Sequence, residues 1–330
     1  VEANIRERLR EAQKAEALVE REVGKWAARL HDQEVVPTIV SLREKLETIR
    51  QHEVAKTLAR IPGATPETRA AIEALHAMDY LEYAYLQTGR DAKARELVEQ
   101  VARVESFDAP EFSAGYALAA IPARHALERR AWKEAAALTV RPAAFPWERY
   151  PYAEAIVHFA RAVGGARAGD VETARRAVAK LKAIQAALQG QKGFDWATQV
   201  EIQRRTAASW LARAEKKDEE AEALMRSAAD LEDSTDKHPV TPGSILPARE
   251  QLADLLAELG QPTAALAEYE TSLRSAPARF NSYDGAARAA QGAGQKEKAK
   301  TFRAQVDALC SGSVPARAAP AKAAALPERQ

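Results

Sequence analysis

The sequence predicts an all-α protein, because helix-favouring residues dominate it and its apolar residues recur with a helical period. Hydrophobic residues make up 46% of the 330 residues and charged residues 29%, whereas aromatic residues make up only 6%. A chain rich in Ala, Leu, Glu, Arg and Lys favours helices over strands. Single hydrophobic cores stop growing near about 250–300 residues, so we expect two modules or a repeat array.

The charge of the chain is balanced, which argues against a role that depends on one strong electrostatic field. Lys and Arg number 48 and Asp and Glu number 47, giving a formal net charge of +1. Such a chain does not attract nucleic acid or an anionic membrane through its overall charge, and its arginine-rich stretches have acidic neighbours. The sequence therefore predicts no nucleic-acid partner and no membrane partner.

We expect neither a signal peptide nor a membrane-spanning segment. The sequence has no apolar run of about 18 residues, and its charged start, VEANIRERLR, lacks the apolar segment of a signal peptide. The single cysteine, Cys310, has no intrachain disulfide partner, so a reducing compartment is permitted. A cytoplasmic protein is expected. The start without Met, within a helical pattern, is typical of a piece of a longer protein.

Residues 1–75 are predicted to form a module of three helices. Apolar residues recur at three- and four-residue steps from Asn4 to Leu30, as in a long amphipathic helix. Pro37 breaks the pattern, and a second amphipathic helix runs to about Arg60. In the turn at 62–67, Thr65 is placed to cap a third helix that starts with Pro66.

The long apolar stripe of this module needs a surface to cover it. Self-association through a two-fold contact would supply one, and the repeat array folding back onto the stripe is the alternative. The residues predicted at the dimer contact are Ile5, Leu9, Val19, Val23, Trp26, Ile39, Leu42, Leu46 and Ile49.

The same region resembles the C-terminal dimerisation domain of glutamyl-tRNA reductase. The resemblance rests on residues 4–26 and on EVVPTIVSLREKLETIR at 34–50, with the P-T-I-x-x-L-R core between Pro37 and Arg43 as its most specific part. It implies that residues 1–75 pair two subunits. The catalytic and nucleotide-binding domains of that family precede this region and have no counterpart here, and no Gly-rich dinucleotide-binding fingerprint occurs, so the resemblance does not imply reductase activity.

Residues 76–310 are predicted to form an array of about six helix pairs. Between Leu252 and Pro277, small and large apolar residues lie at the offsets of a tetratricopeptide repeat, and related patterns recur from Leu81 to Ala299. Longer loops are expected at 106–112, 140–151, 189–196 and 233–247. The region is similar to bacterial tetratricopeptide-repeat proteins, which implies a solenoid that binds peptides or proteins. Residues 311–330 are expected to be a disordered tail, with docking in the groove as the alternative.

No Gly or Pro interrupts the sequence between Pro66 and Gln87, so one helix is expected to belong to both modules. Such a shared helix would connect the two modules stiffly. The meeting of two families within one helix favours an engineered helical fusion, and a natural open reading frame is the alternative.

The residues that could carry chemistry show no catalytic or metal-binding pattern. The six histidines are scattered, with no two spaced to bind one ion, so we expect no metal and no cofactor. The remaining candidate is the concave face of the array, where the helix phase places Tyr83, Arg124, Arg167, Gln203, Trp210, Arg213 and Asp254. Ordinary solvated or inter-repeat positions are the alternative for these residues.

Three classes of function follow. The first is a non-catalytic scaffold that forms a homodimer or a larger symmetric assembly. The second is a natural adaptor that binds a peptide or protein in its groove. An enzyme is the third, and the sequence disfavours it.

Overall fold

The computed structural model describes residues 66–105, 111–236, 238 and 241–311. The chain divides into two compact units, Val1–Ala59 and Arg60–Gln330, and all of the described residues belong to the second unit. The first two predicted helices, the nine predicted dimer-contact residues and residues 312–330 lie outside the described residues. The account that follows concerns the second unit.

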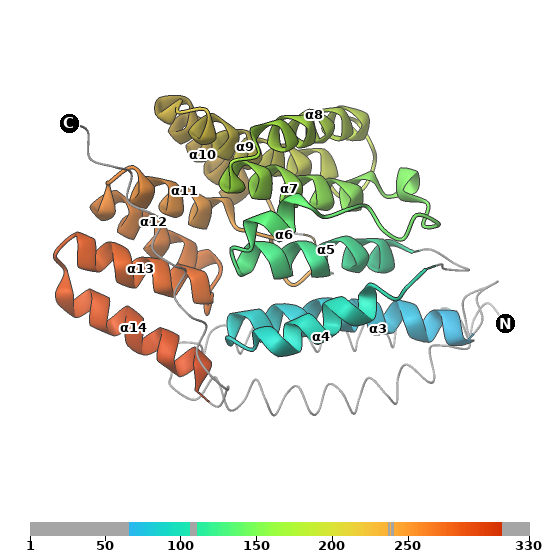
Figure 1. The fold of residues 1–330 in the computed structure, drawn as a ribbon, viewed down its shortest axis with the longest axis horizontal. Coiled ribbons are helices and arrows are strands. Elements are labelled where there is room, and N and C mark those ends of the chain that lie inside the picture. Colours follow the sequence, from blue (N-terminus) through green and yellow to red (C-terminus); the bar gives the residue numbers. More distant parts are fainter. Residues whose placement is uncertain (1–65, 106–110, 237, 239–240, 312–330) are drawn as a thin grey trace. The chain divides into compact units, whose positions relative to one another are not determined.

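The described residues are helical, with no strand among them, which confirms the all-α prediction for this part of the chain (Figure 1). The α-helices and one 3-10 helix, η1, are α3 (Pro66–Gln87), α4 (Asp91–Val101), α5 (Phe112–Glu128), α6 (Trp132–Ala136), η1 (Trp147–Arg149), α7 (Pro151–Ala168), α8 (Val171–Leu188), α9 (Trp196–Ala214), α10 (Asp218–Asp233), α11 (Ala248–Glu258), α12 (Pro262–Ser275), α13 (Phe280–Gly292) and α14 (Lys296–Cys310).

The helices form six consecutive hairpins whose turns share one geometry. Each turn holds one residue with a φ between 55° and 84°, and the next residue donates its backbone N–H to the carbonyl five residues earlier, at 2.8 or 2.9 Å. This is the bond that closes a helix in the Schellman motif, which favours glycine at the positive-φ position. The positive-φ residues are Gly89, Arg130, Gly169, Lys216, Gly260 and Gly294. The hairpins therefore repeat one local design, whereas their assignment as tetratricopeptide repeats stays a prediction.

Alanine and glycine allow the helices to pack closely around one apolar core. The first helices of successive hairpins contact each other, from α3 to α5 and onward to α13. Many of the buried residues are alanines, with Trp210, Phe159 and Tyr269 among the largest side chains. At Gly164 in α7 the backbone of α6 comes so near that an added Cβ would lie 2.5 Å from the Ala136 nitrogen. Small residues at such positions set the spacing of the array.

The two ends of the array touch. Helix α3 contacts α13, and Figure 1 shows the last two helices beside the ends of the first hairpins. The backbone N–H of Phe280 donates to Oε1 of Gln87 at 3.0 Å, and Nδ2 of Asn281 donates to the Glu128 carbonyl at 3.0 Å. Among the described residues, these bonds tie the start of α13 to the ends of α3 and α5.

The continuous helix expected between Pro66 and Gln87 is present as α3. A module boundary at 75/76 would fall inside this helix. Because the second compact unit begins at Arg60, α3 belongs wholly to that unit.

Replacing Gly164 with Ala is expected to lower the free energy of unfolding by about 1–3 kcal/mol, as overpacking does in a core that cannot give way. The atoms nearest to the new Cβ include the Ala136 nitrogen and the Trp132 carbonyl oxygen, both of which are backbone. Urea unfolding would measure the change.

The matched control is Gly292→Ala, where the nearest atom is the Pro262 Cβ at 3.1 Å. A shift of a few tenths of an ångström relieves this contact, so the loss should be clearly smaller. Equal losses at the two positions would contradict the account of the α6–α7 contact.

Candidate functional site

The inner side of the array is built around a buried guanidinium. Arg279, just before α13, forms a two-point ion pair with Glu250 of α11, with both N–O distances at 2.9 Å. It also pairs with Glu128 at the end of α5, at 2.6 Å. All three side chains are almost completely buried. Burial alone would lower the pKa of Arg279, but Glu128 and Glu250 raise it well above its ordinary value, so the side chain stays charged.

A second buried cluster joins α3 to α5. The Arg124 guanidinium pairs with Asp79 and, at 3.2 Å, with Glu82, and all three side chains are buried. One cation thus faces two carboxyl groups. Burial raises the pKa of Glu82 well above its ordinary value, although Arg124 opposes the shift. The cluster is therefore most stable when Glu82 holds a proton.

A third cluster joins the α5–α6 turn to α11 and α12. Asp254 accepts hydrogen bonds from Arg130 at 2.9 Å and from the Tyr269 hydroxyl at 2.5 Å. Burial alone would raise the pKa of Asp254, but Arg130 and then Tyr269 lower it, and the net shift is downward. Next to it, Trp210 donates to Gln251 at 2.9 Å, and the Arg167 guanidinium lies 4.1 Å from the centre of the Trp210 ring.

The structure separates the seven predicted groove residues. Arg124, Trp210 and Asp254 are buried in the clusters just described. Arg167 joins Trp210, and Tyr83 lies under Arg124. Arg213 pairs with Asp218 near the α9–α10 turn, and Gln203 lines a separate cavity. One open groove formed by all seven residues stays a prediction. Three of them are buried against neighbouring helices, since Arg124 pairs with Asp79, Trp210 bonds Gln251, and Asp254 pairs with Arg130.

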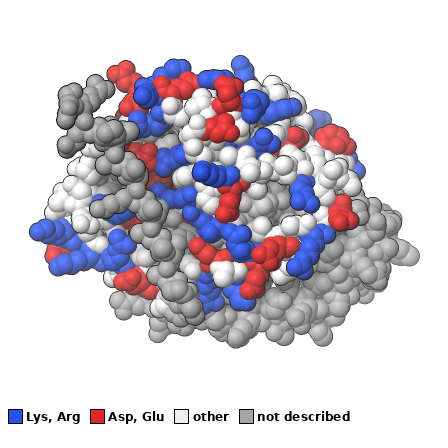
Figure 2. Space-filling model, in the orientation of Figure 1, with Lys and Arg blue, Asp and Glu red and all other residues white. Residues whose placement is uncertain are grey.

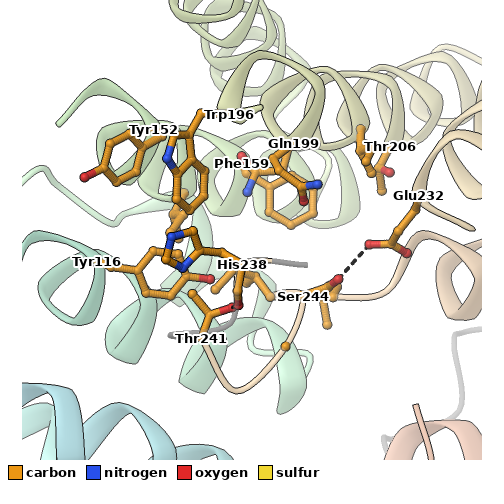
Figure 3. Close-up of a pocket in the computed structure, with 16 residues that line it drawn as sticks. Tyr116, Tyr152, Phe159, Trp196, Gln199, Thr206, Glu232, His238, Thr241 and Ser244 are labelled. Carbon is orange, nitrogen blue, oxygen red and sulfur yellow. Dashed lines mark hydrogen bonds between the residues drawn. The ribbon is translucent and has the colours of Figure 1, made fainter. Parts of the chain in front are cut away.

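The cavity that Gln203 lines lies between α5, α7, α9 and the segment before α11 (Figure 3). Its volume is about 50 Å³, and it opens to solvent. Its aromatic wall is a stack in which the Trp196 ring lies 4.3 Å from Tyr152 and 5.1 Å from His238, measured between ring centres. Such stacks present large rigid faces to a ligand.

The polar groups of the cavity lie opposite this wall. Figure 3 shows Glu232 beside Ser244, with Gln199 and Thr206 above the cavity. Glu232 accepts hydrogen bonds from the Ser244 hydroxyl at 2.7 Å and from the Ala248 backbone N–H at 2.6 Å. Burial raises the pKa of Glu232.

The sequence indicated only fragments of this cavity. The loops expected at 189–196 and 233–247 contain Trp196 and His238, and these loops are present. Tyr116 and Tyr152 were not singled out, because their separate positions on two helices left no pattern to find. The sequence around the Glu232-Asp233 pair favours a solvated helix end, whereas Glu232 lines the cavity, where burial raises its pKa.

The described residues show no arrangement typical of a metal centre or of a membrane span. Across residues 66–311, omitting the undescribed positions, no group of three or more His, Cys, Asp and Glu could hold a metal ion. No described helix is both long and apolar enough to cross a membrane. On the face shown in Figure 2, basic and acidic side chains are interspersed.

The N-terminal region is similar to a dimerisation domain. The family model described as "Glutamyl-tRNAGlu reductase, dimerisation domain" matches residues 14–78. Glutamyl-tRNA reductases from Desulfatibacillum aliphaticivorans and Geotalea uraniireducens are 49% and 47% identical to this chain over 75 residues. Ile5 and Leu9 precede the family match, and the other seven predicted dimer-contact residues lie within it.

These similarities cover a small part of this chain and a small part of each relative. The aligned residues are 23% of this chain and 17% of each relative, so the chain matches less than a fifth of the length of these curated relatives. No solved structure matches the chain. The matched region supports a role in self-association.

Substituting Arg279 with Met is expected to lower the free energy of unfolding by about 3–5 kcal/mol, because Glu128 and Glu250 would lose their buried cation. Urea unfolding would measure this loss. As a control, Lys300→Met removes an exposed pair with Glu297 and should change stability by less than about 0.5 kcal/mol. A small loss at Arg279 would show that its pairs are not important for folding.

Replacing Glu82 with Gln is expected to stabilise the protein more at pH 8 than at pH 5. The folded-state pKa of Glu82 is raised, so its favourable contribution is complete below the ordinary value of 4.5 and is lost as the pH rises through the folded pKa. Gln keeps an acceptor for Arg124 and carries no charge. The measurement is urea unfolding of both proteins at both pH values.

The control is Glu297→Gln, where the carboxyl group is 85% exposed. Its effect on stability should be the same at both pH values. A pH-independent effect of Glu82→Gln as well would refute the assignment of the raised pKa.

Proposed function

We propose that the chain is a non-catalytic scaffold that self-associates through its N-terminal region and carries one helical-hairpin unit per copy. The match to a dimerisation domain over residues 14–78 supports self-association. Because only 17% of each reductase is matched, the similarity gives no support to reductase activity in this chain.

One observation carries the scaffold proposal. Residues 66–78 belong both to the dimerisation-domain match and to α3, which continues to Gln87 and packs against α4, α5 and α13. A helix shared by two modules acts as a semi-rigid spacer. Two copies would then hold their helical units in a restricted geometry, as a symmetric assembly requires.

The origin of this arrangement is part of the proposal. A match to a dimerisation domain that ends inside α3, followed by hairpins that we expect to be tetratricopeptide-like, favours an engineered helical fusion that forms a homodimer or a larger symmetric assembly. A natural protein with the same shared helix is the alternative, and it would function in the same scaffold role.

The second candidate function is a natural tetratricopeptide-like adaptor that binds a peptide or protein. The cavity beside Trp196 is the observation that favours it, since an aromatic wall with polar groups opposite is typical of a ligand site. On this proposal the partner binds at the cavity, because the inner side of the array is filled.

The self-association proposal predicts a solution mass of twice 36.0 kDa or a higher multiple, measured by light scattering during size-exclusion chromatography. Leu42→Asp should shift the mass toward one chain, because a charge is costly in an apolar contact. Ala183→Asp, on the exposed side of α8, is the matched control and should leave the mass unchanged. A concentration-independent monomer for the unmodified chain would rule the scaffold out.

A further inference from the structure

Among the described residues that line the cavity beside Trp196, one side chain carries a carboxyl group and none is a Lys or Arg. Sixteen described residues line it, and Glu232 is the one Asp or Glu among them. His238 also lines it, and burial lowers the pKa of this histidine, which favours the neutral ring at neutral pH. We propose that the cavity binds an ammonium group on a short aliphatic stem, in the form of a lysine side chain of a peptide or of a free alkylamine.

The aliphatic stem has an apolar surface to cover. Ile156 and Phe159 of α7 and Ile202 of α9 line the cavity and are almost completely buried in the folded protein. Methylene groups placed against such side chains leave water at a gain of about 0.8 kcal/mol each. This surface selects for a stem rather than a compact inorganic cation.

The aromatic rings favour a positive charge. Trp196 and Tyr152 stack face to face, and Tyr116 lines the same cavity. An ammonium within about 6 Å of an indole or phenol ring is attracted by the negative face of that ring. Because Tyr152 and His238 stack on Trp196, the ammonium meets the ring surface that these neighbours leave open. An anionic ligand would meet the same rings and Glu232 with no compensating base.

The Glu232 carboxyl group is held in place and keeps unused acceptor capacity. Burial raises its pKa, and an ammonium bound beside it favours the ionised form. Its two oxygens accept one hydrogen bond each, from the Ser244 hydroxyl and from the Ala248 backbone N–H. A carboxylate has about four lone-pair sites, so about two remain for a ligand. These two bonds fix the orientation of the carboxylate, so a ligand would not have to order it.

Gln203 also lines the cavity, and its side chain has an acceptor that is not used within the protein's described residues. Oε1 of Gln203 is buried and has no hydrogen-bond partner among the described residues. An unsatisfied buried acceptor costs about 1–3 kcal/mol, and a small rotation of the amide toward an ammonium N–H would remove that cost. Gln203 and Glu232 together supply acceptors and no competing positive charge.

The proposal is independent of self-association, because every residue it uses lies in the second compact unit. A titration that shows no ligand binding therefore contradicts this inference alone, and a mass measurement that shows a monomer contradicts the self-association proposal alone.

The test is calorimetric titration of the full chain with four probes. Two carry an ammonium group, n-pentylammonium chloride and the peptide acetyl-Gly-Gly-Lys-Gly-Gly-amide. The other two are their neutral counterparts, 1-pentanol and the same peptide with norleucine. We expect saturable one-site binding of the ammonium probes and at least about tenfold weaker binding of the neutral ones. Tighter binding of the lysine peptide than of the free amine identifies a peptide ligand, and the reverse order identifies a free amine.

Variants locate the binding site. Glu232→Gln should weaken both ammonium probes about tenfold, and Glu219→Gln, which removes an exposed carboxylate from the same helix, should not. Because Glu232 also holds the segment before α11, Trp196→Leu provides a second test that keeps the carboxylate, with an expected weakening of about fivefold. The proposal is overturned if the ammonium probes do not bind at about 10 mM, if the neutral probes bind equally well, or if neither variant changes the affinity.

Discussion

The ion pairs of Arg279 with Glu128 and Glu250 constrain how the last hairpin lies against α5 and α11. A buried charge is tolerated only when partners of the opposite sign surround it with good geometry. Here the cation precedes α13, and its partners lie on α5 and α11. The helix pairs must therefore stack at an angle that brings the last hairpin back to the first two. Simple stacking of neighbouring pairs does not require this closure.

This closure decides where a ligand can bind. In an open array the first helices of each pair present a continuous concave surface. In this unit the same helices hold Arg124, Trp210 and Asp254 in buried clusters, where they bond Asp79, Gln251 and Tyr269 respectively. The cavity beside Trp196 is lined instead by residues from helices and from the segment before α11. An array with a filled interior is suited to act as a rigid body, which is the property that a scaffold needs.

Local features of the fold could be predicted from the sequence, and contacts between distant residues could not. The hairpins follow from small residues at regular spacing and from turn glycines such as Gly169, which act within a few residues. The sequence placed Arg124 and Asp254 among the groove residues, and the structure buries both in ion pairs. Their burial depends on contacts such as Glu128 with Arg279, which are 151 residues apart in the sequence and leave no periodic signal. The cavity was missed for the same reason, since Tyr116, Trp196 and Glu232 meet only in the folded chain.

The N-terminal resemblance was recognisable because its motif is contiguous, and the family match over residues 14–78 supports it.

Native-state hydrogen exchange tests the closure of the array most directly. In an open stack of repeats the terminal pairs fray first, and the protection of their amides decreases toward both ends. If the Arg279 pairs join the ends, amides of α3 and α13 should exchange with nearly the same opening free energy as those of α7 and α9. Graded protection, lowest in the first and last hairpins, would contradict the closed arrangement and the rigid scaffold built on it.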